Sequence, residues 1–183
     1  IFKIDSKNTS YIIDIYRLGY YNEKGARKMG SIIPKPVNRK ECTIDRSTGL
    51  VDCGNWEKTA EWKVPATAVS GVYLAHLKDS ENRANHIIFV VRNDSKKSDL
   101  LFQTSDTTWQ AYNFYGEYNF YNGKTPDYPR GRAVKISYNR PLQGYGIDFF
   151  FNAEYPMLRW LERNGYDVSY CSGVDVARNK NVI

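Results

Sequence analysis

The stretch DLLFQTSDTTWQAYNFYG, from Asp99 to Gly116, decides the fold expected for this chain. Its first part, LLFQT, is a short apolar run typical of a strand that is buried on both faces. Polar and aromatic side chains follow at once, among them Ser105, Asp106, Trp109 and Tyr112. Ligands of open α/β sheets gather beyond the carboxyl ends of the strands. The segment is therefore either part of a site or an aromatic loop packed onto the core.

The chain beyond this stretch has the order expected of an α/β sheet. Residues 132–138 alternate as a strand, residues 153–165 show the one strong helical pattern, and residues 167–170 follow as another strand. Pro156 is tolerated only in the first turn of that helix, and Gly165 stands where a C-terminal cap belongs. Strand, long loop, strand, helix and strand predict a doubly wound α/β sheet.

The first half of the chain has a different pattern, without a convincing helical period. Its clearest segments are residues 11–18, 71–77 and 86–91, which alternate or are continuously apolar, with turn signals between them. Strands at this spacing predict an immunoglobulin-like β-sandwich over residues 1–97. The α/β part then spans residues 98–183.

Composition excludes several classes of protein. The 183 residues are 42% apolar, enough for a real core, and no run of about 18 apolar residues predicts a membrane span. The net charge of +6 lies wholly in residues 1–97, with 17 basic against 11 acidic residues, since the remainder has 9 of each. The basic residues stand mostly singly and no nucleic-acid-binding motif is present, so we expect no nucleic acid partner.

Three cysteines give information on the compartment. Cys42 and Cys53 flank the turn-rich segment TIDRSTGLVD, which is typical of a disulfide across a hairpin. A disulfide would indicate a secreted or periplasmic protein, whereas two reduced cysteines in the cytoplasm are the alternative. Cys171 is expected to be a buried structural cysteine, because His76 and His86, the only candidate bases for a catalytic thiol, belong to the other half of the chain.

Several polar groups meet on one edge if the strands of the second half are parallel. They include the tyrosines Tyr112 and Tyr138, Glu154 at the start of the helix, and the amides Asn139 and Asn152. Phenolate and carboxylate oxygens suit a trivalent metal such as iron. Without a metal, the same groups could bind a sugar or polyol. In the structural alternative, Glu154 stabilises the helix N-terminus by its charge and both tyrosines pack.

Long runs of this sequence closely resemble the N,N-dimethylformamidase large (beta) subunit family, in order and over nearly the whole chain. These runs are SGVYLAHL, FVVRND, SDLLFQTSDTTWQAYNFYG, RAVKISYNRP and FNAEYPMLRWLERNGYDVSY. The resemblance implies a β-sandwich followed by a flavodoxin-like or glutamine-amidotransferase-like α/β domain. It also implies hydrolysis of a small amide to an amine and formate, at a mononuclear iron held by two tyrosines and one glutamate.

Carried over by motif, the implied iron ligands are Tyr112 in WQAYN, Tyr138 in SYNRP and Glu154 in FNAEYP. The metal would polarise the amide carbonyl and activate a bound water. Glu154, Asn139 and Asn152 are the expected catalytic residues. Asn152 stands where the resemblance implies a histidine. This difference predicts either a different substrate or loss of the family's activity.

Two functions from different classes are therefore open. The first is a metal-dependent amidohydrolase acting on a small amide. The second is a secreted, non-catalytic binding or assembly protein, whose β-sandwich and aromatic loop contact a glycan or a partner subunit. Relatives continue past the position of Ile183, so the α/β domain is expected to be incomplete. We expect a homo-oligomer, or association with the missing C-terminal part or another subunit.

Overall fold

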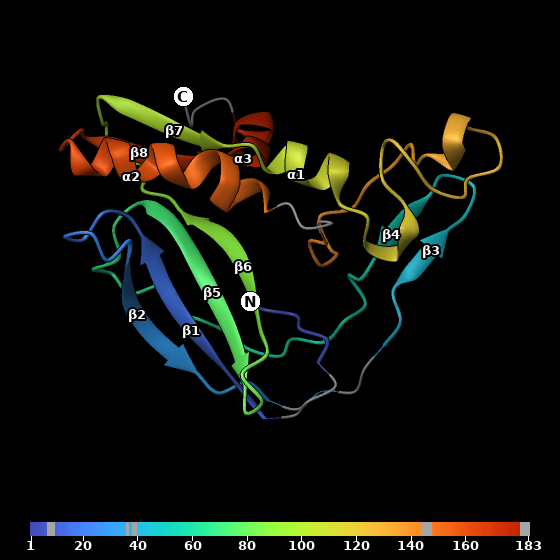
Figure 1. The fold of residues 1–183 in the computed structure, drawn as a ribbon, viewed down its shortest axis with the longest axis horizontal. Coiled ribbons are helices and arrows are strands. Elements are labelled where there is room, and N and C mark those ends of the chain that lie inside the picture. Colours follow the sequence, from blue (N-terminus) through green and yellow to red (C-terminus); the bar gives the residue numbers. More distant parts are fainter. Residues whose placement is uncertain (7–9, 36, 38–39, 144–147, 180–183) are drawn as a thin grey trace.

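The computed structural model describes residues 1–6, 10–35, 37, 40–143 and 148–179. The fold is mixed α+β, and most of its strands are antiparallel. Figure 1 shows a twisted sheet at the lower left, a long helix lying across it, and a small hairpin at the right. No helix among the described residues has the length and apolar character needed to cross a membrane.

A four-stranded antiparallel sheet forms most of the first half, in the order β2-β1-β5-β6. Three of these strands confirm the predicted segments, whereas β2, with its sequence ARKMGSI, lacks a clear apolar alternation and was not predicted. Side chains alternate along β5, so that Tyr73 and Ala75 face one core cluster and Val72 and Leu74 face the other. The strands are β1 (Tyr11–Leu18), β2 (Ala26–Ile32), β5 (Gly71–Asp79) and β6 (Ala84–Val91).

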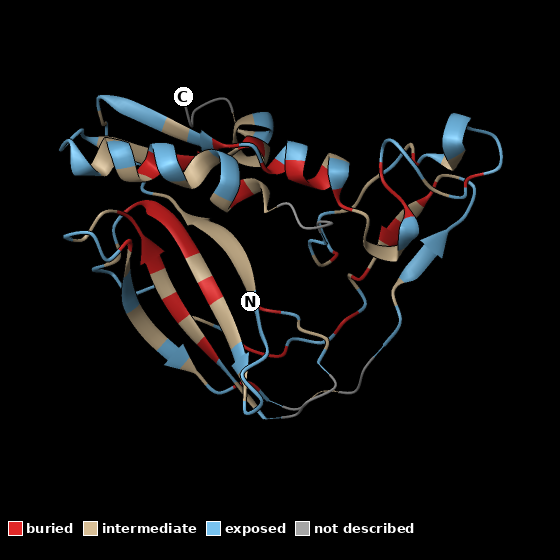
Figure 2. Cartoon of the chain, in the orientation of Figure 1, coloured by how far each residue is buried: buried red, intermediate tan, exposed pale blue. Residues whose placement is uncertain are grey.

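Both faces of this sheet are covered. Phe2, Ala60 and Trp62 pack on one face, and on the other lie helix α2 (Tyr155–Arg163) and strand β8 (Val168–Ser172). The buried residues lie in the first half of β5 and alternate along β1 toward its C-terminal end, and α2 has one buried residue, Leu158 (Figure 2). Among the described residues, neither cover is a second antiparallel sheet, so the immunoglobulin-like sandwich stays a prediction.

A parallel pair of strands begins the second half. Strand β7 (Leu100–Thr104) runs parallel to β8, which confirms the parallel arrangement assumed for the candidate site. Helix α2 lies between them in sequence and has Pro156 in its first turn, as expected. Gly165 follows the helix with a φ of +74°, a left-handed conformation that glycine adopts without strain. Residues 180–183, the end of the predicted α/β part, lie outside the described residues.

Two predictions about this half were wrong. The expected aromatic loop, from Trp109 to Tyr121, is helical in its first part, because helix α1 (Asp106–Tyr112) includes its first residues and buries Trp109 and Gln110. Residues 132–138 are not a strand, because their backbone N–H groups reach separate segments instead of one neighbouring strand: Ala133 donates to Asn119, and Val134 donates to Thr48. The remaining short elements are α3 (Gly173–Arg178) and the turns η1 (Tyr115–Glu117), η2 (Pro129–Gly131) and η3 (Phe150–Glu154), the last a π-helical turn.

The hairpin predicted between two cysteines is present. Strands β3 (Thr43–Asp45) and β4 (Leu50–Asp52) pair antiparallel, and a disulfide joins Cys42 to Cys53. Cys171 is buried and reduced, as predicted, and burial raises the pKa of its thiol. A disulfide in the native fold is typical of oxidising compartments.

Candidate functional site

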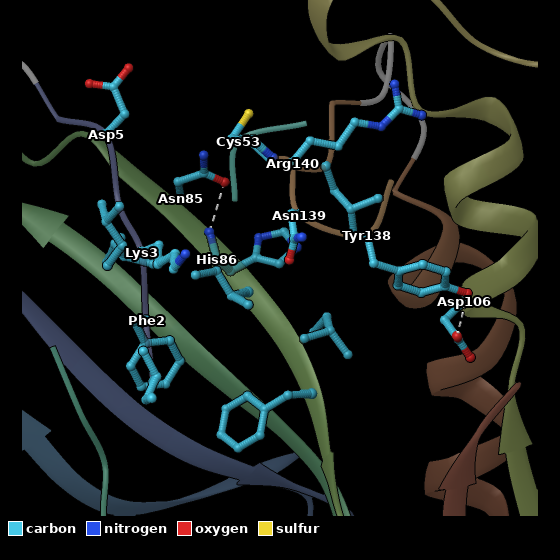
Figure 3. Close-up of a pocket in the computed structure, with 18 of the residues that line it drawn as sticks. Phe2, Lys3, Asp5, Cys53, Asn85, His86, Asp106, Tyr138, Asn139 and Arg140 are labelled. Carbon is cyan, nitrogen blue, oxygen red and sulfur yellow. Dashed lines mark hydrogen bonds between the residues drawn. The ribbon is translucent and has the colours of Figure 1, made fainter. Parts of the chain in front are cut away.

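A cleft of about 1010 Å³ lies between the antiparallel sheet and the second half of the chain. The N-terminal segment and edge strand β6, which carries His86, form one wall. Residues 138–142 and the first turns of α1 and α3 form the other wall (Figure 3). Two of the predicted site residues, Tyr138 and Asn139, line this cleft together with Asp106.

Asp106 and Tyr138 form a hydrogen-bonded pair in the wall of the cleft. The hydroxyl of Tyr138 donates to Oδ2 of Asp106 at 2.8 Å. The carboxylate also accepts hydrogen bonds from the Thr104 hydroxyl at 2.9 Å and from the backbone N–H of Gly173 at 2.5 Å. Burial raises the pKa of Tyr138, and the bond to Asp106 raises it further. The phenol of Tyr138 therefore keeps its proton at neutral pH.

The parallel strands explain why Asp106 lies at this point. Thr104, the last residue of β7, pairs with Ser172, the last residue of β8. Each strand leads directly into a short helix, so Asp106 in α1 meets the first backbone N–H groups of α3. Ser172 and Asp175 fix α3 by a reciprocal capping box. The prediction that polar groups gather at the carboxyl ends of these strands is thus confirmed for Asp106.

The β3–β4 hairpin holds the segment that carries Tyr138. The carbonyl of Asn139 accepts the backbone N–H of Cys53 at 2.6 Å. The carboxylate of Asp52 accepts the Ser137 hydroxyl at 2.6 Å, and this bond lowers the pKa of Asp52. The disulfide-closed hairpin therefore determines where Tyr138 enters the cleft.

Arg140 fastens the same segment to the end of α1. Its guanidinium is buried and donates to the backbone carbonyls of Gln110 and Tyr118, at 3.2 and 3.0 Å. Burial lowers the pKa of Arg140 to about 10. Figure 3 shows its head directed away from the space beside Tyr138, so we assign Arg140 a structural role.

Glu154 lies at the junction of the π-helical turn and α2, outside the cleft lining. Its Oε1 accepts the indole N–H of Trp109 at 2.7 Å and the backbone N–H of Ser105 at 3.2 Å. Its Oε2 is buried without a hydrogen-bond partner among the described residues. Burial raises the pKa of Glu154 above its ordinary value, although both hydrogen bonds act to lower it.

This raised pKa predicts a gain in stability for Glu154→Gln. A carboxyl whose folded pKa exceeds its unfolded value stabilises the fold fully at low pH and loses that contribution as pH rises through the folded pKa. Glutamine stays neutral and keeps an acceptor for Trp109 and Ser105. We expect the variant to have a higher urea midpoint than the native protein near pH 7, with the difference vanishing near pH 4. Glu41→Gln, at an exposed carboxylate, is the control, and an unchanged or lower midpoint at neutral pH contradicts the prediction.

The other predicted residues have surroundings of their own. The ring of Tyr112 stacks on that of Tyr121, with centroids 4.5 Å apart, and contacts Phe149. Both stacked tyrosines are 45% exposed, and a hydrogen bond with Tyr112 raises the pKa of Tyr121. Asn152 is exposed on the π-helical turn. Neither Tyr112 nor Asn152 lines the cleft.

The three implied iron ligands each have a different partner in the structure. Tyr138 bonds to Asp106, Glu154 bonds to Trp109, and Tyr112 stacks on Tyr121. Among the described residues, no group of three histidine, cysteine or acidic side chains is placed to hold a metal ion, but tyrosine, which supplies two of the three implied ligands, is not one of these residue types. The ligand set implied by the family resemblance therefore stays a prediction.

The sequence did not predict the partner of His86, a residue of the cleft wall. His86 on β6 lies 2.9 Å from Asp148, which precedes the π-helical turn. The two residues are 62 positions apart and belong to the two halves that the sequence separated. No sequence pattern links them, because only the packing of α2 on the sheet brings them together.

The fold and cleft define a mixed α+β protein whose polar groups lie at the carboxyl ends of a parallel strand pair. A family model described as N,N-dimethylformamidase beta subunit-like, C-terminal, matches residues 12–183. The chain belongs to this family, which supports a hydrolase-type function at the family level. No curated protein matches the chain.

Proposed function

We propose that this protein hydrolyses the carbon–nitrogen bond of an amide in the cleft beside Asp106 and Tyr138. The observation that carries the proposal is the family match over residues 12–183. The cleft supports it, because it combines a fixed polar pair with room for an organic substrate. Pockets of this kind, mostly apolar with a few convergent polar groups, are typical of small-molecule sites.

The chemistry open to Tyr138 follows from its hydrogen bond. After donating to Asp106, its hydroxyl oxygen keeps lone pairs that can accept a hydrogen bond. The side chain is 46% exposed in the cleft wall, so a water molecule can reach this oxygen. Tyr138 would hold the water in a fixed position beside a bound amide, and such positioning contributes to catalysis by lowering the entropy lost on reaction.

The test is amide turnover by the purified protein. We expect the native protein to release formate and dimethylamine from N,N-dimethylformamide. Tyr138→Phe removes one hydrogen bond and should lower kcat/KM by about 10- to 100-fold. Tyr128→Phe, at an exposed tyrosine outside the cleft, should leave the rate unchanged. Absence of product from the native protein with both primary and tertiary amides contradicts the proposal.

Iron remains an expectation from the family resemblance, and we assign it no step of the reaction. We expect stoichiometric iron in purified protein, with a visible tyrosinate-to-iron absorption band that weakens in Tyr138→Phe. Elemental analysis and absorption spectra of the two proteins measure this directly. Purified protein without iron, or an identical band in both proteins, contradicts the role of Tyr138 as a ligand.

The finer predictions on fold and location belong to the same proposal. The antiparallel order β2-β1-β5-β6 supports an immunoglobulin-like sandwich, and the parallel pair β7-β8 supports a flavodoxin-like part. The disulfide between Cys42 and Cys53 supports a secreted or periplasmic location.

The exposed stack of Tyr112 on Tyr121 favours glycan binding as the second candidate function, because aromatic faces pack against sugar rings. In that case Tyr112→Ala, and not Tyr138→Phe, should abolish binding.

A further inference from the structure

His86, in the cleft wall opposite Asp106 and Tyr138, pairs with Asp148, which is not a lining residue of the cleft. The Nε2 atom of His86 lies 2.9 Å from Oδ2 of Asp148. The side chains are 35% and 33% exposed, so solvent and small molecules can reach the pair. His86 lines the cleft, and Figure 3 shows it on strand β6, with Tyr138 on the opposite wall.

Both members of the pair are held in place. The ring of His86 packs edge-to-face on Phe151, with centroids 5.4 Å apart and an interplanar angle of 83°. The backbone N–H of Phe151 donates to Oδ1 of Asp148 at 2.9 Å, which leaves Oδ2 for the histidine. One side chain comes from the sheet and the other from the turn before α2. Their alignment therefore depends on the native packing of the two halves.

The position of Asp148 selects one form of the neutral imidazole ring. Because Nε2 faces a carboxylate, it carries the proton and donates it to Oδ2. The Nδ1 atom is then unprotonated and can accept a proton. Within the described residues, Nδ1 makes no side-chain hydrogen bond, so its lone pair is available. A histidine oriented by a carboxylate in this manner is the arrangement used for general base catalysis.

We infer that His86 is the general base and acid of the cleft and that Asp148 is its positioning residue, an inference that rests on the proposed amide hydrolysis. Nδ1 removes a proton from water as the water oxygen bonds to the amide carbonyl carbon. The protonated ring then gives this proton to the amide nitrogen as the carbon–nitrogen bond breaks. The products are a carboxylic acid and an amine, and no oxidant or reductant is consumed.

The kinetic experiment compares three variants of the full chain with N,N-dimethylformamide as substrate. His86→Gln should lower kcat by about 100- to 10,000-fold and change KM by less than about threefold. Asp148→Asn should lower kcat by at least about 10-fold, because the ring loses its fixed form. The matched control is His76→Gln, directly across the strand pair from His86 but outside the cleft lining. An unchanged kcat in folded His86→Gln overturns the inference while leaving the proposed hydrolysis intact.

If the native protein hydrolyses no amide, the proposed hydrolysis is contradicted, and a second measurement then tests the assignment of His86 separately. Long-range proton–nitrogen NMR spectra of the native protein report which ring nitrogen of each histidine carries the proton. We expect the Nε2-protonated form for His86, and a shift of its Nδ1 signal when formamide is added. His76 should show no such shift. An Nδ1-protonated ring, or a His86 signal that formamide leaves unmoved, overturns the inference.

Discussion

Glu162→Gln is expected to lower the free energy of unfolding by about 3 to 5 kcal/mol, because it breaks a buried ion pair and leaves one charge without its partner. Arg17 on β1 donates to Glu162 on α2 at 2.7 Å, and their side chains are only 11% and 18% exposed. Burial alone would lower the pKa of Arg17, but the hydrogen bond and charge of Glu162 raise it overall. The folded protein therefore depends on this carboxylate to keep the guanidinium stable.

The residues around Arg17 and Glu162 cannot replace the negative charge that Glu162→Gln removes. Arg17 also donates to the Tyr21 hydroxyl at 2.8 Å and to the backbone carbonyl of Ser70 at 2.9 Å. The hydroxyl of Tyr170 donates to Glu162 at 3.0 Å. A neutral glutamine keeps some of these bonds but not the charge, and the buried guanidinium has no other carboxylate in hydrogen-bond reach among the described residues.

Urea unfolding followed by circular dichroism measures the effect. Glu61→Gln, which breaks the exposed pair with Lys58, should leave the midpoint within experimental error. The double variant Arg17→Met/Glu162→Leu should recover much of the lost stability, because apolar side chains can replace a buried pair. If Glu162→Gln and Glu61→Gln behave alike, the buried pair does not stabilise the packing of α2 on the sheet.

Asp106→Asn should have the second largest effect, a loss of about 1.5 to 3 kcal/mol in the free energy of unfolding. The native carboxylate accepts hydrogen bonds from Thr104, Tyr138 and the backbone N–H of Gly173. The asparagine side chain has only one acceptor oxygen. Its NH₂ group, which is itself a donor, would therefore face some of these donors in place of the second carboxylate oxygen. The same substitution should lower the pKa of Tyr138 while leaving it above its ordinary value, because burial is the larger cause of the raised pKa.

Two measurements separate these effects. Urea unfolding gives the stability, and the ultraviolet absorbance of tyrosinate during an alkaline titration gives the pKa of Tyr138 by difference from Tyr138→Phe. Asp127→Asn, at an exposed carboxylate, should change neither quantity. An unaltered titration of Tyr138 in Asp106→Asn would mean that the hydroxyl does not depend on this carboxylate.

Much of the fold could be predicted because its signals are local. The alternating segments became β1, β5 and β6, and the apolar runs became β7 and β8. Pro156 and Gly165 correctly predicted the two ends of α2. Proline fits only the first turn of a helix, and glycine readily adopts the left-handed conformation that follows the last turn. The disulfide between Cys42 and Cys53 was predicted because a short hairpin brings its flanking residues together.

Features that depend on distant packing were missed. In DTTWQAY, Trp109 and Gln110 are buried against other segments, and the sequence itself has no apolar stripe that indicates a helix. Residues 132–138 have the right alternation for a strand but no neighbouring strand to pair with. Of the site residues predicted from sequence, Tyr138 and Asn139 line the cleft. The partner of His86 comes from the other half of the chain, and only the tertiary structure reveals it.

The core cluster between the sheet and α2 has a consequence for folding cooperativity. It contains Leu18 and Val72 from the first half, and Leu158 and Tyr170 from the second, all nearly inaccessible to solvent. Cutting the chain near residue 97 would divide this cluster and expose an apolar surface on each fragment. The two halves should therefore melt in a single transition, and the cleft between them should exist only while both are folded together.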